Sequence, residues 1–176
     1  MCLYSVAHCT PLLIQQNDGS GGFNRPWAEY KEGFGDPSGN YWLGNDLLNE
    51  LTDMNRYKLQ FDLHSRYSGK WYSAKYSTFI VLSEEFDYRL QAAGFSGNAS
   101  NDAFGDHNNR DTFSTFDLDN DGRSKINCAA TIGGGFWYRF CGQCRVNGAR
   151  STGNFYWRGL PGGWDLQYSR MWLQCR

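Results

Sequence analysis

The strongest constraint on the fold of this chain lies between Phe113 and Cys141, where three aspartates, a glycine and two cysteines follow one another closely. The segment reads FSTFDLDNDGRSKINCAATIGGGFWYRFC, so Asp117, Asp119 and Asp121 occupy alternate positions directly before a glycine. Carboxylate oxygens held on a turn are ligands that Ca²⁺ prefers. A solvated acidic loop is the alternative, but the regular spacing favours a bound Ca²⁺ that braces the neighbouring chain.

The same aspartates resemble the beginning of an EF-hand loop, which also carries a glycine at its sixth position. An EF-hand requires a bidentate glutamate at its twelfth position, and Cys128 occupies that position here. We therefore predict a different kind of Ca²⁺ site, on a loop without long flanking helices.

The six cysteines form an even number, which is typical of three disulfides and an oxidising compartment. They are Cys2, Cys9, Cys128, Cys141, Cys144 and Cys175. Zinc held by the group from position 128 to position 144 is the alternative, although no histidine lies near it. We expect disulfides. The first two cysteines pair with each other across a short loop, or with cysteines upstream.

The composition favours a sheet-rich protein over a helical bundle. Aromatic residues make up 17% of the 176 residues, and 21 residues are glycine, a combination that suits short strands, tight turns and exposed aromatic surfaces. The formal net charge is only −1, so no overall field attracts nucleic acid or an anionic membrane. No apolar run is long enough for membrane insertion, and no signal peptide begins the chain, so the signal of a secreted form would lie upstream.

Hydrophobic periodicity predicts an antiparallel meander over residues 57–92, covered on one face by short helices. Leu59, Phe61 and Leu63 alternate with polar residues and indicate a half-buried strand. Further strands are expected over 12–16, 71–82 and 86–92. A helix should begin at Trp27 and end before a glycine at position 33. Another should follow Asn45 or Asp46 as its cap, with an apolar face formed by leucines.

Regular signals largely stop after Gly94, because residues 94–135 are rich in Gly, Asn, Asp and Ser. A loop of this length in a compact domain is usually functional or disordered. Asn98 begins an Asn-Ala-Ser sequon for N-glycosylation, with a turn asparagine as the alternative.

Several spaced motifs resemble the fibrinogen C-terminal domain, also called the fibrinogen-related domain, and within it the ficolin and tachylectin-like immune lectins of invertebrates. The resemblance runs from about position 13 to position 148. The motifs, in order, are WAEYKEGFG (27–35), YWLGND (41–46), SGNA (96–99), FST (113–115), DLDND (117–121), NCA (127–129), GGFWY (134–138) and NG (147–148).

The resemblance implies an α+β fold in one domain over residues 1–176. It places a central antiparallel sheet with short helices at 12–93, after a shortened N-terminal subdomain. A loop-rich subdomain at 94–176 would carry Ca²⁺, a disulfide and the ligand pocket.

The family's metal site maps onto the aspartate run. The resemblance implies side-chain ligation by Asp119 and Asp121, with backbone carbonyls from about Arg123 and Lys125, while Asp117 stands outside the first ligand sphere. It also implies the disulfide Cys128–Cys141 beside the metal, which contributes about 3 kcal/mol in the chain-entropy model. An additional disulfide, Cys144–Cys175, is expected to tie the C-terminal segment down, with free or exchanged pairing as the alternative.

In lectin members of the family, a pocket next to the Ca²⁺ binds acetyl groups, and a cis peptide bond shapes it. Here that bond would join Phe140 to Cys141. Gly142 stands where the family often has histidine. The residues predicted for the pocket are Ile132, Phe140, Cys141, Gly142, Phe155, Tyr156, Trp157 and His107. Core packing is the alternative for residues 155–157, and Arg110 is the alternative to His107 as a polar contact. We expect Trp137 and Tyr138 to pack in the core instead.

The leading functional hypothesis is a secreted, non-catalytic pattern-recognition lectin of innate immunity. It would bind acetylated glycans or bacterial surface polymers such as peptidoglycan and lipopolysaccharide, with affinity raised by oligomerisation through an upstream N-terminal region. The alternative is a protein-interaction module of an extracellular or adhesive protein, which the glycine at position 142 favours. An enzyme is not expected, because His8, His64 and His107 form no nucleophile–base pattern.

Overall fold

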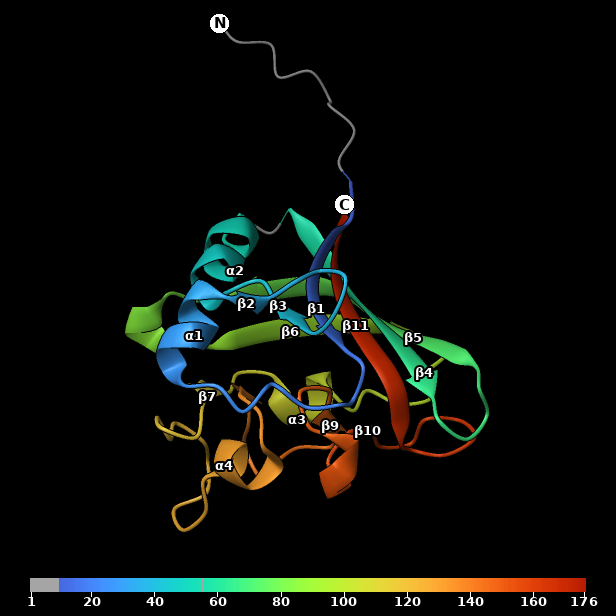
Figure 1. The fold of residues 1–176 in the computed structure, drawn as a ribbon. Coiled ribbons are helices and arrows are strands. Elements are labelled where there is room, and N and C mark those ends of the chain that lie inside the picture. Colours follow the sequence, from blue (N-terminus) through green and yellow to red (C-terminus); the bar gives the residue numbers. More distant parts are fainter. Residues whose placement is uncertain (1–9, 55) are drawn as a thin grey trace, which may run out of the picture.

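The computed structural model describes residues 10–54 and 56–176, and it contains a twisted seven-stranded antiparallel sheet with a loop-rich end below it (Figure 1). The strand order is β2-β3-β1-β11-β4-β5-β6. The strands are β1 Leu12–Asn17, β2 Phe34–Gly35, β3 Tyr41–Trp42, β4 Tyr57–Ser65, β5 Trp71–Val81, β6 Leu90–Gly97 and β11 Leu166–Cys175.

The alternation predicted for β4 is confirmed. Leu59, Phe61 and Leu63 are fully buried, and the intervening side chains lie on the opposite, more open face. The buried face packs against the loop-rich end as well as against helices. The centre of the Phe61 ring lies 4.9 Å from that of Phe104 and 5.1 Å from that of Trp157. The loop-rich end therefore shares one core with the sheet.

Helices α1, Trp27–Glu32, and α2, Asn45–Thr52, lie together at one side of the sheet (Figure 1). The first ends at Gly33, as predicted, where φ is 98°. The predicted side-chain cap of α2 is wrong. Gly44 occupies the cap position, and Asn45 is already the first residue of the helix. The Asn45 side chain does not cap the helix, and its Oδ1 accepts a hydrogen bond from Trp42 Nε1 at 3.1 Å instead.

The strand predicted over 86–92 is wrong in its first half. A 3₁₀ turn, η1, covers Glu84–Phe86, and Asp87 and Tyr88 have φ angles of 51° and 49°, which no strand accommodates. The turn places the Tyr88 ring in the core, 5.4 Å from the ring of Trp27. β6 begins only at Leu90, and it continues to Gly97, beyond the predicted end.

β11 is a central strand that the sequence did not reveal. It pairs with β1 on one side and with β4 on the other. Its register shifts between Leu166 and Tyr168, so the buried residues do not alternate regularly through the segment. The C-terminal segment thus belongs to the sheet. The sheet is therefore not confined to the residues before the subdomain boundary predicted between positions 93 and 94.

Short elements and turns make up the loop-rich end, residues 98–165 (Figure 1). They are α3 Gly105–Asn108, β7 Phe113–Ser114, α4 Cys128–Ile132, β8 Phe136–Trp137, β9 Cys144–Arg145, η2 Arg150–Thr152 and β10 Tyr156–Trp157. Trp137 and Tyr138 pack in the core, as predicted. Trp137 Nε1 donates to the carbonyl of Tyr88 at 2.7 Å.

Buried polar side chains of the sheet hold the loop-rich end in place. Asn17 Nδ2 donates to the carbonyls of Val146 at 2.8 Å and Gly148 at 2.9 Å. Gln15 Nε2 donates to the same Val146 carbonyl at 3.0 Å and to Ser169 Oγ at 3.0 Å. Because these side chains are fully buried, their hydrogen bonds fix the orientation of the segment between β9 and η2.

Candidate functional site

The predicted disulfide between Cys128 and Cys141 is confirmed, with 4.9 Å between the two Cα atoms. Cys128 begins α4, and Asn127 caps this helix by accepting a hydrogen bond from the backbone N–H of Ala130 at 2.8 Å. The cis bond predicted before Cys141 is wrong, because residues 10–54 and 56–176 contain only trans peptide bonds. The chain turns instead through positive φ angles of 61° at Cys141 and 62° at Gly142.

The predicted disulfide Cys144–Cys175 is also wrong. Cys144 carries a free, fully buried thiol in β9, and burial raises the pKa of that thiol well above its ordinary value. Cys175 is disulfide-bonded, but it lies at the end of β11, far from β9 (Figure 1). The remaining predictions, for Cys2 and Cys9, lie outside the described residues.

The aspartates form a hydrogen-bonded turn over residues 117–125, the aspartate turn. Asp117 Oδ1 accepts from the backbone N–H of Trp27 at 3.0 Å and thereby links the turn to α1. Asp121 accepts from the backbone N–H groups of Arg123 at 2.6 Å and Cys128 at 2.7 Å. The backbone N–H of Asp121 donates to Asp119 Oδ1 at 3.3 Å, so the two predicted carboxylate ligands are neighbours.

The electrostatics of the aspartate turn fit a hard cation. Burial raises the pKa of Asp121, and the adjacent charge of Asp119 raises it further against the lowering effect of two backbone hydrogen bonds. Within the described residues, neither carboxylate forms an ion pair, and no three Asp, Glu, His or Cys side chains converge. The backbone carbonyls of Arg123 and Lys125 accept no hydrogen bond from the described residues. Two carboxylates with free carbonyls suit Ca²⁺ better than Zn²⁺.

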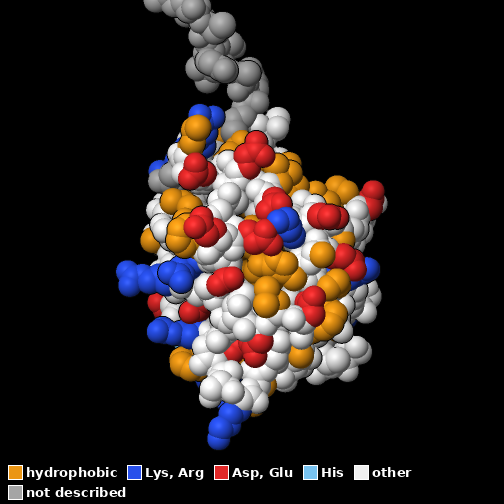
Figure 2. Space-filling model, turned by 90° about the vertical axis from the view of Figure 1, so that its left-hand side faces the viewer, with side chains coloured by type: hydrophobic (Ala, Val, Ile, Leu, Met, Phe, Trp, Pro, Cys, Tyr) orange, Lys and Arg blue, Asp and Glu red, His pale blue; other side chains and the backbone are white. Residues whose placement is uncertain are grey.

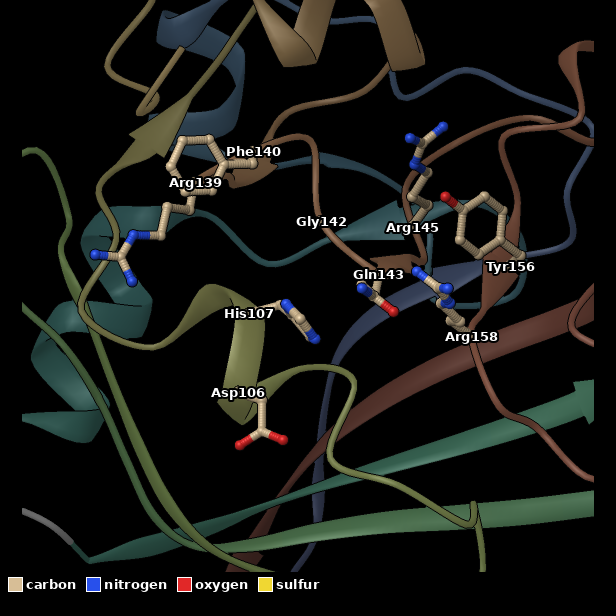
Figure 3. A pocket seen from close by; sticks show the side chains of 9 residues that line it. All are labelled: Asp106, His107, Arg139, Phe140, Gly142, Gln143, Arg145, Tyr156 and Arg158. Atoms are coloured by element: carbon tan, nitrogen blue, oxygen red, sulfur yellow. The ribbon is translucent and has the colours of Figure 1, made fainter.

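A hollow of about 570 Å³ opens at the loop-rich end, and we call it the arginine hollow (Figure 3). Four of the predicted pocket residues line it: His107, Phe140, Gly142 and Tyr156. Five further lining residues were not predicted: Asp106, Arg139, Gln143, Arg145 and Arg158.

The other four predicted pocket residues do not line this hollow. Cys141 is nearly buried as part of the disulfide, and Ile132 and Phe155 are 1% and 2% exposed. Trp157 is fully buried against Phe61 of the sheet. Residues 155–157 follow the alternation of a strand, so only the middle one, Tyr156, faces the hollow.

Arg145 is the best-anchored cation of the arginine hollow. It lies opposite Tyr156 in the β9–β10 ladder, and its guanidinium carbon stands 4.8 Å from the centre of that ring. Its Nε donates to the carbonyl of Cys141 at 3.2 Å, and its Nη1 donates to Asn154 Oδ1 at 2.5 Å. Because the pairing of β9 with β10 creates this arrangement, sequence spacing alone gave no signal for it.

The other two arginines stand on either side of the hollow (Figure 3). Arg139 lies beside Phe140, and its Nε is 4.0 Å from Asp111 Oδ1. Arg158 lies near Arg145, and its guanidinium carbon stacks 5.2 Å from the centre of the Trp164 ring. The hollow therefore combines three guanidinium groups with exposed aromatic rings.

Asn98 of the sequon is exposed directly after β6. Its Oδ1 accepts from the backbone N–H of Ser73 at 2.7 Å, which is the role expected of a turn asparagine. Glycosylation of this residue stays a prediction.

Comparison with known proteins identifies the family. Residues 7–169 match the family model described as fibrinogen beta and gamma chains, C-terminal globular domain, and the chain belongs to this family. The fibrinogen-like globe domain of human ANGPTL2 is 34% identical, with a TM-score of 0.84 over 94% of this chain and 80% of that chain. Lamprey fibrin D-dimer, complexed with the peptide Gly-His-Arg-Pro-amide, is 29% identical, with a TM-score of 0.79 over 92% of this chain and 60% of that chain.

Curated relatives are similar in sequence over most of this chain. Human angiopoietin-2 is 36% identical over 93% of this chain, and Drosophila melanogaster scabrous is 37% identical over 94%. The matched regions are 34% and 21% of those proteins, so the chain spans about a third of the relatives or less. Chicken tenascin is 34% identical over 93% of this chain and 9% of its own length.

These relatives correct the leading functional hypothesis. The prediction of an acetyl-binding immune lectin is wrong, because the matched proteins are angiopoietins, scabrous and tenascin, and the ligand in the lamprey structure is a peptide. The findings favour the alternative, a protein-interaction module. The relatives are secreted or extracellular, and no helix in residues 10–54 or 56–176 is long and apolar enough to cross a bilayer.

Proposed function

We propose that this chain is a non-catalytic interaction domain of an extracellular protein, and that it binds a polypeptide segment of a partner in the arginine hollow. The observation that carries the proposal is the composition of the hollow, where three arginines stand beside the rings of Phe140 and Tyr156. Arginine and tyrosine are enriched among the residues that dominate the binding energy of protein interfaces. A hollow of this size accommodates a few side chains of a bound segment.

Phe140 is the exposed anchor that this proposal requires. Its side chain is 66% exposed and lines the hollow without a place in the core. Tyr156 stands on the opposite side, and its ring is held by Arg145 (Figure 3). Two aromatic surfaces facing one space can enclose a partner side chain and exclude water from it.

The groups around the hollow support binding rather than catalysis. Its lining has His107 and Asp106 but no serine, threonine or cysteine that could act as a nucleophile. The nearby thiol of Cys144 is fully buried, and its raised pKa keeps it protonated at neutral pH.

Calcium at the aspartate turn belongs to this proposal as a structural brace. Asp119 and Asp121 would hold the ion with the carbonyls of Arg123 and Lys125. The turn rests against the hollow, because a side chain on Gly122 would stand 2.7 Å from the carbonyl oxygen of Arg139. A bound cation would therefore stiffen the backbone that presents the residues at positions 139 and 140.

A random-peptide display library tests the proposal. We expect peptides selected on the protein, in the presence of excess N-acetylglucosamine, to lose binding about tenfold or more on Phe140→Ala or Tyr156→Ala. Phe86→Ala is the matched control, because Phe86 is 49% exposed on the distant turn η1. Failure to enrich any peptide, or enrichment of peptides that ignore both hollow substitutions, would refute the proposed function.

A further inference from the structure

We infer that the arginine hollow selects an acidic segment of its partner, with a carboxylate held between Arg145 and Arg158. This inference rests on the proposed function and adds the chemical class of the bound segment. Guanidinium groups recognise carboxylates through paired, charge-assisted hydrogen bonds, which are stronger and more directional than neutral ones.

Arg145 is preorganised for this task. Its bonds to the Cys141 carbonyl and to Asn154 Oδ1, together with the ring of Tyr156, fix the guanidinium before any ligand arrives. These contacts use Nε and Nη1 and leave Nη2 without a hydrogen bond to the described protein. An immobilised arginine loses little conformational entropy on binding, so its hydrogen bonds contribute more fully to affinity.

No carboxylate within the described chain neutralises Arg145 or Arg158. The ion pairs among those residues involve other cations, and Arg139 alone of the three hollow arginines lies within 4.0 Å of a carboxylate, that of Asp111. Asp106 lines the hollow, but its carboxylate points away from the guanidinium groups (Figure 3). Two neighbouring cations without a counter-ion favour an anionic ligand and disfavour a cationic one.

Arg158 and Gln143 complete one wall of the site. The backbone N–H of Arg158 donates to the carbonyl of Gln143 at 2.9 Å, which sets the spacing between the two segments. The Arg158 side chain is exposed, and it stacks on Trp164 at 5.2 Å. Arg145, Gln143 and Arg158 therefore stand together on one side of the hollow (Figure 3).

The acidic side chains on another face of the molecule differ from the hollow arginines, because most of those named have partners. Acidic side chains spread over the face formed around α1, α2 and η1, which Figure 2 shows. They include Glu29, Asp46, Glu84 and Glu85. Glu29 forms an ion pair with Arg25, and Asp46 and Glu84 both form ion pairs with Lys31. The acidic side chains of that face therefore have cationic partners within the chain, whereas Arg145 and Arg158 of the arginine hollow have no such counter-ion among the described residues.

The inferred preference is opposite in charge to the ligand in a related structure. Lamprey fibrin D-dimer is complexed with Gly-His-Arg-Pro-amide, a peptide that carries an arginine and no carboxylate. The arginines of this chain would repel such a peptide, so it serves as a negative control.

The test uses fluorescence polarisation with four labelled peptides built on one selected sequence. One carries glutamate side chains and an amidated end, one has glutamine in place of glutamate, and one has lysine. The fourth has glutamine and a free C-terminal carboxylate. We expect the glutamate peptide or the free-carboxylate peptide to bind about tenfold or more tightly than the amidated glutamine peptide, which also tells the source of the carboxylate. The lysine peptide and Gly-His-Arg-Pro-amide should not bind.

Charge-matched variants locate the contact. Arg158→Gln should lower the affinity for the carboxylate peptide about tenfold while the affinity for the amidated glutamine peptide changes little. Arg145→Gln should do the same, and Arg158→Gln keeps the test valid if loss of the Arg145 contacts prevents folding. Arg56→Gln, directly before β4, is the control with equal charge change. Peptides that bind in a Phe140-dependent way with equal affinity for all charge forms would overturn this inference and leave the proposed function standing.

Discussion

Asn17 provides the sharpest test of how the sheet positions the loop-rich end. Its side chain is fully buried, and Asn17→Ala removes three hydrogen bonds, to the carbonyls of Val146 and Gly148 and from the N–H of Gly19. The Val146 carbonyl keeps Gln15 as a donor, so two buried backbone groups lose their partner. At about 1–3 kcal/mol for each unsatisfied buried group, the free energy of unfolding should fall by roughly 2–6 kcal/mol.

Urea unfolding followed by tryptophan fluorescence measures this loss, with the exposed Asn24→Ala as the matched control. The control should change the free energy of unfolding by less than about 0.5 kcal/mol. Hydrogen exchange at the Gly19 amide gives a local readout, because this group loses its acceptor. A loss below about 1 kcal/mol for Asn17→Ala would show that the buried hydrogen bonds do not hold the two parts together.

Three further predictions concern the disulfide, a buried carboxyl and the metal. Cys128→Ala with Cys141→Ala should cost about 3 kcal/mol of unfolding free energy in urea, and an unchanged midpoint would contradict the cross-link's role. Burial raises the pKa of Asp111 to about 6, although the neighbouring Arg139 lowers it. Between the ordinary pKa of an aspartate and this value, the folded protein retains a proton that the unfolded chain loses. Stability should therefore fall as the pH rises from about 4 to 6, and Asp111→Asn should stabilise the protein by about 1 kcal/mol at neutral pH, after allowance for solvent screening. If the urea midpoints of the wild type and of Asp111→Asn depended on pH in the same way, the raised pKa of Asp111 would be refuted. Finally, a chelator should lower the thermal midpoint of the wild type by several degrees but leave Asp119→Asn unchanged, whereas equal midpoints with and without chelator would exclude a structural Ca²⁺.

Local patterns predicted the parts of the fold that depend on near neighbours. The alternation through β4 identified its buried face, and Gly33 marked the end of α1. The spaced motifs from Trp27 to Gly148 indicated the family, and the resemblance implied the disulfide Cys128–Cys141. The first two features need only local sequence spacing, because each is set within one element, whereas the disulfide followed from the resemblance to the family.

Features that depend on long-range pairing were not predictable in this way. β11 lies at the centre of the sheet, yet the irregularity between Leu166 and Tyr168 breaks its alternation. The arginine hollow depends on the register that sets Arg145 opposite Tyr156. The sequence left Trp157 between the pocket wall and the core, and it lies in the core because strand alternation turns it away from the side that Tyr156 faces. In each case tertiary pairing, rather than local preference, decides where the side chain lies.

A double-mutant cycle between Arg158 and a ligand glutamate tests the central claim most directly. The four affinities are those of the wild type and Arg158→Gln for the glutamate peptide and for its glutamine counterpart. If the carboxylate binds in the arginine hollow, the coupling free energy should be at least about 1 kcal/mol, because each change removes the same contact. A coupling free energy near zero, with the peptide still bound, would show that the acidic group binds elsewhere.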